Sequence, residues 1–240
     1  FVEAVRHYRE RITDPVLKAQ VAGFIGQEAM HSKEHQGFND MATRQGYPVD
    51  KLDRDVTKLL DLVQKTLPKP VQLAATVALE HYTAIIAEML LRDADVQQKF
   101  SVEARHLWLW HALEENEHKT VAYDVYQQMV GSYGLRVATM ALTTVIFFAV
   151  TFAFHTRMLA ADGQLFKFRQ TWQAMKYLWN GKKGVFSRLL PKYLDFFKPS
   201  FHPKDHDTDA LLAQWKEILF AKEDGVLYEQ LKNKSAVGVH

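Results

Sequence analysis

The chain has 240 residues, 48% of them hydrophobic, which is enough for one large domain or two small ones with a sizeable core. Thirty Lys and Arg against 28 Asp and Glu leave a formal charge of +2, which gives no reason to expect a nucleic-acid partner. The absence of Cys excludes disulfides, thiolate catalysis and Cys-ligated metal clusters, and it favours a reducing, cytoplasmic compartment. Metal ligands, if present, must be carboxylates and some of the 11 His.

The first half of the chain is predicted to be helical, because Gly and Pro are sparse before residue 131 and the apolar spacing follows a helical period. The expected helices cover residues 1–12, 15–44, 56–67, 70–92 and 101–130. Short breaks between the first two and between the last two favour antiparallel hairpins. We therefore expect an all-α fold with an up-down-up-down four-helix bundle over residues 1–131.

The second half, residues 132–240, is expected to add an apolar helix and several basic, aromatic helices. Residues 137–154 carry no charge over 18 positions, which is the lower limit for a membrane span and also suits a buried central helix. Between residues 166 and 198 basic and aromatic side chains are interleaved, and Asp195 is the only acid. This mixture suits either a membrane surface or amphipathic helices that pack their aromatic residues on the bundle. A last helix is expected from Thr208 to Lys222.

Two of the expected helices carry the same pair of polar residues on one face. Glu28-x-x-His31 and Glu115-x-x-His118 share the i, i+3 spacing that places both side chains on one side of a helix. Glu80 stands alone in the apolar segment TVALEHYTAIIAEML, where burying an unpaired carboxylate is costly. A hairpin turn near residue 97 brings Glu80 level with Glu115.

Two Glu-x-x-His helices, with one Glu from each of two further helices, form the ligand set of ferritin-like di-iron and di-manganese bundles. Carboxylates can bridge two cations, and imidazole suits iron. We therefore expect a ferritin-like site for two divalent metal ions, iron first, with manganese or zinc as alternatives. The expected ligands are Glu28, His31, Glu80, Glu115 and His118, with Glu3 as the one acidic candidate on the first helix.

Other polar residues have competing interpretations. His35 and His111 are candidates for hydrogen bonding a ligand or moving a proton, at opposite ends of the site if their helices run parallel, or are ordinary core histidines. His81 is expected to contact a neighbouring helix. A second pair, Glu103-x-x-His106, is rotated by about 120° from the site face and is interpreted as a chance match. A buried polar network without metal is the alternative for the whole cluster.

The segment FHPKDHD, residues 201–207, contains two His and two Asp. A loop and helix cap are favoured over a second metal site, because the Pro and the acidic residues suit the start of the following helix. A Gly-rich phosphate loop and a Ser nucleophile elbow are both absent from the sequence.

Three segments, FIGQEAMHSKEH, ALEHYTA and WHALEENEHKTVAYDVY, resemble a bacterial family of predicted metal-dependent hydrolases with a ferritin-like core. The resemblance extends to VRHYRERI at the start, to the apolar segment and to FHPKDHD. It implies a Gly-Glu pair shortly before the position of Phe1, so the ligand of the first helix is expected outside this chain. The family's hydrolase label is itself a prediction, and ferritin-like carboxylate bundles more often perform oxygen chemistry.

The leading functional hypothesis is a di-metal enzyme, an oxidase or oxygenase that acts on an apolar or lipid-like substrate. The alternatives are a hydrolase that uses a metal-bound hydroxide and a non-enzymatic, ferritin-like iron-handling protein. Expected partners are an apolar small molecule or lipid, a membrane surface and a second copy of the chain in a homodimer, with no nucleic acid. We expect a cytoplasmic protein that is peripheral or monotopic at the inner membrane.

Overall fold

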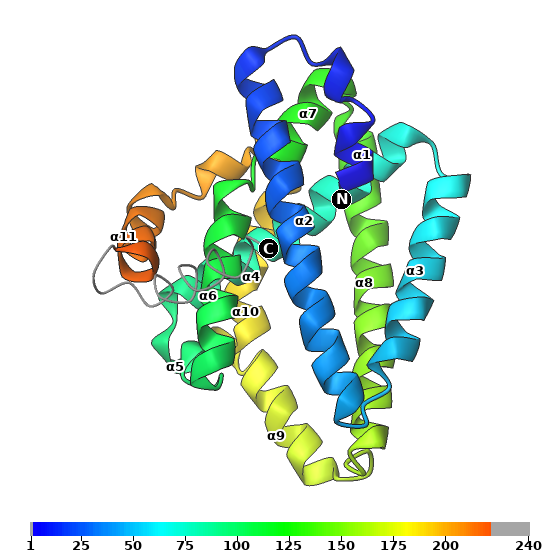
Figure 1. The fold of residues 1–240 in the computed structure, drawn as a ribbon, viewed down its shortest axis with the longest axis vertical. Helices are drawn as coiled ribbons and strands as arrows, with labels where there is room; N and C mark the ends of the chain where they lie inside the picture. The colour runs from blue at the N-terminus through cyan, green and yellow to red at the C-terminus, as the bar shows by residue number, and fades with distance from the viewer. Residues whose placement is uncertain (1, 222–240) are drawn as a thin grey trace, which may run out of the picture.

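The computed structural model describes residues 2–221, and over that range every regular element is a helix (Figure 1), which confirms the all-α prediction. The long elements are α2 (Pro15–Arg44), α3 (Val49–Thr66), α4 (Lys69–Arg92), α6 (Val102–Glu117) and α8 (Tyr133–Ala161). The shorter α-helices are α1 (Val2–Arg6), α5 (Ala94–Gln97), α7 (Val121–Met129), α9 (Phe168–Trp179), α10 (Val185–Asp195) and α11 (Asp209–Phe220). Short 3-10 helices are η1 (Arg9–Arg11), η2 (Gly181–Lys183) and η3 (Pro203–Asp205).

The residues that the sequence indicates as helix starts lie at the N-termini of the long helices in the structure. The Asp14 side chain accepts a hydrogen bond from the amide of Val16, and Pro15 occupies the first turn of α2. Pro70 likewise lies in the first turn of α4, and the Ser101 hydroxyl accepts from the amide of Ala104 at the start of α6. The final helix starts close to the expected Thr208, and the expected end at Lys222 lies outside the described residues.

The direction of the bundle helices differs from the expected up-down-up-down order. Gln27 of α2 bonds to Glu117 of α6, and His35 lies against His111, so α2 and α6 run antiparallel. The reason is α3, which begins at Val49 instead of residue 56 and is long enough to carry the chain back along α2 (Figure 1). The four bundle elements α1, α2, α4 and α6 therefore follow an up-down-down-up order with one crossover, an order found in ferritin-like folds.

The fourth expected helix is interrupted in the middle. It was expected to run unbroken over residues 101–130, but α6 ends at Glu117 and α7 starts at Val121. At this break the Lys119 side chain donates hydrogen bonds to the carbonyl of His206 and to the hydroxyl of Thr208. Contacts with the chain after α10 therefore override a local sequence that contains no helix breaker.

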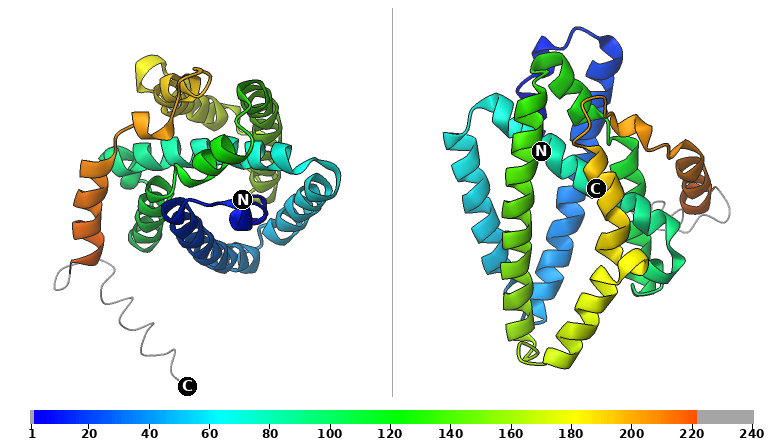
Figure 2. Two further views of the ribbon diagram at one scale, coloured as in Figure 1. Left: turned by 90° about the horizontal axis from the view of Figure 1, so that it is seen from above. Right: turned by 180° about the vertical axis from the view of Figure 1, so that it is seen from behind.

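Helix α4 lies at the centre of the molecule, with helices from both halves of the chain around it (Figure 2, left). The main core cluster joins Val21 of α2 and Ala78 of α4 to Met140 of α8 and Phe196, just after α10. Residues of both expected regions, 1–131 and 132–240, therefore share one core.

Two helices are long and apolar enough to cross a membrane by length and composition alone, and they differ in burial. The relevant window of α4 is 72% buried, as expected for the central helix of a folded bundle. The window of α8 is only 11% buried. Packing against the described residues therefore does not explain its apolar character.

Candidate metal centre

Four buried side chains from α2 and from the end of α6 meet between these helices. One potential ligand atom from each of Glu28, His31, Glu115 and His118 lies within 4.8 Å of the others. The i, i+3 spacing in each helix aims both members of a pair at the same point, and the antiparallel helices face their pairs toward one another. Among the side chains that the structure describes, this is the one group of three or more with the proximity needed to hold a metal.

Glu80 of α4 joins this group from a third helix. Its Oε2 atom lies 3.3 Å from Nδ1 of His118, whose Nε2 atom lies 3.5 Å from Oε1 of Glu28. The two carboxylates therefore flank opposite nitrogens of a single imidazole. The structure thus brings together the five side chains that the sequence singles out as ligands.

The cluster has unused hydrogen-bonding atoms, which is the test of whether a metal fits. Oε2 of Glu80, Oε2 of Glu115 and both ring nitrogens of His118 are buried and make no hydrogen bond of good geometry, although His118 lies within ion-pair distance of Glu28 and Glu80. Unpartnered buried groups of this kind are costly, because each has lost its contact with water. Carboxylate oxygens and imidazole nitrogens are also the donors that divalent iron, manganese and zinc accept. The residues therefore fit a metal centre.

His31 is held between carboxylates on both sides of its ring. Its Nδ1 atom lies 3.2 Å from Oε1 of Glu28 and 3.6 Å from Oε1 of Glu115, while its Nε2 atom lies 2.9 Å from Oε2 of Glu114. Burial lowers the pKa of His31, but these carboxylates outweigh it and raise the pKa to about 9. Without a metal, this imidazole is therefore protonated at neutral pH.

The carboxylates of Glu80 and Glu115 respond to their surroundings in opposite directions. Burial raises the pKa of Glu80 to about 7, against the pull of His118. Burial also acts to raise the pKa of Glu115, but His111 and His118 lower it below the ordinary value of a Glu. Burial lowers the pKa of His118 and the adjacent carboxylates raise it, with a net upward shift. Opposed shifts of this kind are expected where carboxylates and imidazoles are held together in a site with little water.

His35 and His111 lie at the same end of the site, so the expectation of opposite ends was wrong. Their ring centroids are 4.9 Å apart, and His111 lies 4.1 Å from the ring of His31. The error follows from helix direction, because α2 and α6 are antiparallel and not parallel. His111 contacts the cluster directly, with Nε2 3.2 Å from Oε1 of Glu115, and burial lowers the pKa of His35.

The remaining candidates lie away from the cluster. Glu3 is exposed and pairs with Arg6 in α1, so the structure does not bring it to the site. His81 bonds to the carbonyl of Lys192 in α10, as expected of a residue that faces a neighbouring helix. His106 is not a member of the cluster, and the side chain of Glu103 lies outside the described part of the chain.

The FHPKDHD segment connects neighbouring elements of the fold through its His side chains. His202 pairs with Asp124 of α7 at 2.9 Å, and His206 pairs with Asp195 at the end of α10 at 3.0 Å. The imidazole of His202 and the carboxylate of Asp205 also form a reciprocal cap around η3. Each imidazole has its own carboxylate partner on another element, which agrees with the loop-and-cap interpretation.

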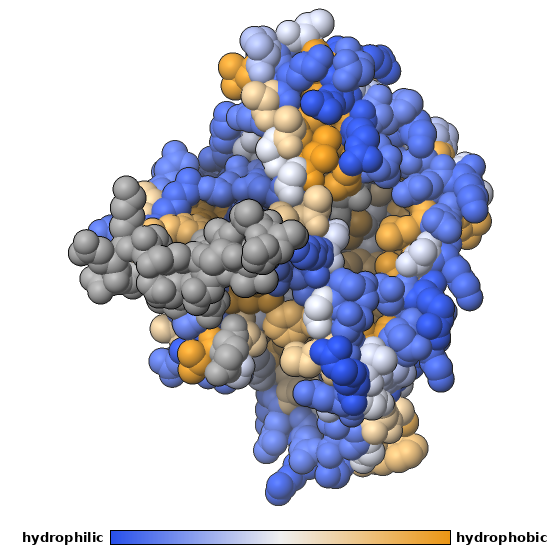
Figure 3. Space-filling view, viewed as in Figure 1, coloured by the Kyte–Doolittle hydropathy of each residue, from blue (hydrophilic) through white to orange (hydrophobic). Residues whose placement is uncertain are grey.

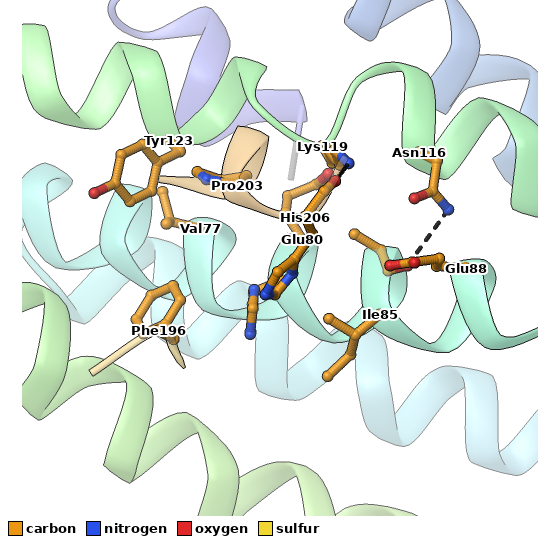
Figure 4. Close-up of a pocket in the computed structure, with 12 residues that line it drawn as sticks. Val77, Glu80, Ile85, Glu88, Asn116, Lys119, Tyr123, Phe196, Pro203 and His206 are labelled. Carbon is orange, nitrogen blue, oxygen red and sulfur yellow. Dashed lines mark hydrogen bonds between the residues drawn. The ribbon is translucent and has the colours of Figure 1, made fainter. Parts of the chain in front are cut away.

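A small cavity lies beside Glu80 (Figure 4). It has a volume of about 10 Å³ and is lined by polar groups, among them Glu80, Asn116, Lys119 and His206. This volume is enough for about one water molecule, and the polar groups offer several partners for it. Figure 4 shows Glu80, Lys119 and His206 together at the centre, with Tyr123 and Phe196 at one end.

Glu114 contacts the cluster although it does not belong to a Glu-x-x-His pair. Its neighbour Glu115 carries the recognisable motif, and Glu114 lies about 100° away around the helix. It reaches Nε2 of His31 because α2 lies on that side of α6. Only the helix arrangement could have revealed this contact.

The comparisons with known proteins agree with this geometry. A model of the predicted metal-dependent hydrolase family matches residues 1–207, which is most of the chain and includes every residue of the cluster. Neither a curated protein nor a solved structure matches the chain. The resemblance found in the sequence is confirmed, and the chain belongs to the predicted metal-dependent hydrolase family.

Proposed function

We propose that the chain is a di-metal carboxylate enzyme, with iron as the metal, which oxidises an apolar or lipid-like substrate. One observation carries the proposal: two Glu-x-x-His pairs on antiparallel helices face each other, with Glu80 on a third helix beside them. This is the donor set of the di-iron carboxylate bundles, apart from one carboxylate of the first helix. The unpartnered atoms of Glu80, Glu115 and His118 support occupancy by a cation.

The residues around the ligands would fix the ligands in place. Nε2 of His31 faces Glu114, so this nitrogen carries the proton and donates to the carboxylate, while Nδ1 faces the cluster. His111 holds Glu115 in the same way through Nε2. When bound, a pair of iron ions supplies the electrons for dioxygen reduction, and any divalent pair supplies Lewis acidity that lowers the pKa of water. Burial of all five ligands excludes bulk water from the reacting centre.

Hydrolysis is the second candidate, and the description of the matched family favours it. The same ligands serve both reactions, since a hydrolase needs two acidic metal ions but no change of oxidation state. His111 and Glu114 lie on the edge of the cluster, where an imidazole and a carboxylate can accept a proton from an attacking water. The two candidates therefore differ in metal chemistry and not in ligand geometry.

The substrate class rests on apolar features outside the cluster. A pocket of about 120 Å³ lies between α4, α8 and α10, and its walls include Tyr82, Phe147, Phe186 and Leu190. Aromatic and aliphatic walls of this kind suit a hydrocarbon chain. The exposed apolar surface of α8 points to the same class of ligand.

Anaerobic loading followed by exposure to air separates the candidates. The metal-stripped protein is loaded with two equivalents of Fe(II) without oxygen, and dioxygen uptake and the visible spectrum are then recorded. We expect uptake and a new absorption band, both lost in Glu115→Gln and kept in the control Glu117→Gln, which lies on the same helix but pairs with Lys216. Absence of both signals, with ester cleavage after loading with Mn(II) or Zn(II), would establish hydrolysis instead. Accumulation of many irons per chain would establish an iron-handling protein.

A further inference from the structure

Helix α9 presents its apolar face outward. Phe168, Trp172, Met175 and Trp179 follow one another at intervals of four, three and four residues, which places them on one side of the helix. They are 75%, 63%, 44% and 50% exposed. An amphipathic surface helix of a water-soluble protein normally turns this stripe toward the core. In the described chain the Trp179 ring contacts Phe186, and the rest of the stripe stays largely exposed.

The same face of the molecule exposes further apolar side chains. On α8, Val145 and Phe152 are exposed, and Phe166 in the turn before α9 is exposed as well. Figure 2 (right) shows α8, α9 and α10 on the side of the molecule seen from behind, where α9 diverges from the end of α8 and leads into α10. The opposite face, over α2 and α3, is largely hydrophilic (Figure 3). We call the exposed apolar side of residues 142–179 the outer face.

Positive charge accompanies the outer face. Residues 163–194 contain seven Lys and Arg and no acidic residue. Arg169 and Lys176 lie about 70–90° around α9 from the centre of the apolar stripe, both along the same edge of it. Lys182 and Lys183 follow at the end of the helix in η2. These four form no ion pair with any residue that the structure describes, in contrast to Lys192, which pairs with Glu88.

Helix α8 cannot act as a membrane span while the bundle keeps this form, because both of its ends are tied to the bundle. Near its start, the buried Arg136 donates to the carbonyl of Lys198. Near its end, Arg157 pairs with Asp55 of α3 at 2.6 Å. The uncharged stretch between the buried Met140 and His155 has about 14 residues, and a span needs about 20. Any membrane contact of the outer face is therefore along the membrane surface.

We propose that the outer face docks on an anionic phospholipid bilayer, with α9 lying in the headgroup plane. The apolar stripe with its two Trp enters the boundary between headgroups and acyl chains, and the flanking Lys and Arg meet lipid phosphates. This goes beyond the proposed function and does not depend on the metal. A second copy of the chain fits less well, because a two-fold contact would oppose the same unpaired positive charges.

Vesicle flotation of the full chain tests the proposal. Wild-type protein is mixed with vesicles of phosphatidylcholine alone or with 30% phosphatidylglycerol. We expect binding to the anionic vesicles that weakens with salt and is much lower on neutral vesicles. In Lys182→Gln/Lys183→Gln, each lost charge should lower the partition coefficient about fivefold. Trp172→Ser/Trp179→Ser should lower it at least as much through the lost apolar insertion.

A matched control removes exposed apolar side chains elsewhere. Leu60→Ser/Leu62→Ser changes two exposed residues of α3 and should bind vesicles like the wild type. Circular dichroism verifies that every variant is folded, as expected for substitutions at exposed positions. Equal flotation of the Trp variant and the wild type would overturn the proposal, as would absence of wild-type binding. A dimer in sedimentation that the Trp substitutions dissociate would also overturn it and assign the outer face to a second copy.

Discussion

At the scale of single residues, the helical period accounts for most of the site. The i, i+3 pairs Glu28 with His31 and Glu115 with His118 face one point because the backbone geometry of a helix fixes their direction. Glu80 could be placed beside them because its hairpin fixes the register. That these residues bind metal stays a prediction. The Glu114 contact with His31 could not be foreseen, since it depends on how two distant helices are oriented.

Glu80 gives a prediction in which affinity and stability change in opposite directions. A buried carboxylate with a raised pKa destabilises the metal-free fold above that pKa. In Glu80→Gln, metal affinity should fall by about 100-fold or more. The unfolding free energy of the metal-free protein at pH 8 should rise by about 1–3 kcal/mol.

Metal titration and urea unfolding of stripped protein check both changes. Glu117→Gln on α6 is the control and should change affinity little, since its side chain pairs with Lys216 and Gln27 and with none of the five ligands. A purely structural Glu80 would show the reverse result, with lower stability and unaltered metal binding.

At the scale of elements, local patterns identified most helices but misjudged two features. The segment from Val49 to Asp55 looked like a loop because it is charged, although Val49, Leu52 and Val56 already have helical spacing. The break between α6 and α7 has no local signal, because no Gly or Pro lies there. It is set by the bonds of Lys119 to the segment before α11, which lies nearly 90 residues later in the chain.

Arg136 is expected to anchor the start of α8. It is buried, and its guanidinium lies 5.0 Å from the ring of Phe196 and 5.4 Å from those of Tyr123 and Tyr133. Arg136→Ala should lower the unfolding free energy by about 3 kcal/mol, because it removes these contacts and the bond to the Lys198 carbonyl. Urea unfolding measures this effect. The exposed ion pair of Arg157 with Asp55, near the end of α8, gives the comparison. Arg157→Ala should lower the unfolding free energy by about 0.5 kcal/mol. Similar values for both variants would contradict the anchor.

At the scale of the whole molecule, the all-α class could be predicted and the path of the chain could not. Direction depends on whether the α3 segment returns along the bundle, and a difference of seven residues in its start decides this. The outer face could not be predicted either, because the sequence between residues 166 and 198 is compatible with both buried and exposed aromatic side chains. Only the packing shows that α9 leaves its stripe largely exposed.

The pKa of His31 links metal binding to pH. Its folded, metal-free pKa of about 9 lies above the unfolded value of 6.5, so its protonated form stabilises the fold below pH 6.5. This stabilisation is lost as pH rises toward 9, and the protons that compete with the metal are lost with it. The gain in melting temperature on adding Mn(II) should therefore be larger at pH 8.5 than at pH 6.5. Calorimetric scans with and without metal measure it, and a gain that does not depend on pH would contradict this linkage.

The most direct test of the central claim is the metal stoichiometry of the folded chain. Stripped protein is titrated with Mn(II) or, without oxygen, with Fe(II), and bound metal is counted by elemental analysis after removal of free ions. Convergence of Glu28, His31, Glu80, Glu115 and His118 on two ions predicts two per chain, and fewer than one in His31→Ala/His118→Ala. A wild-type protein that binds no metal, or a double variant that still binds two ions, would contradict the account.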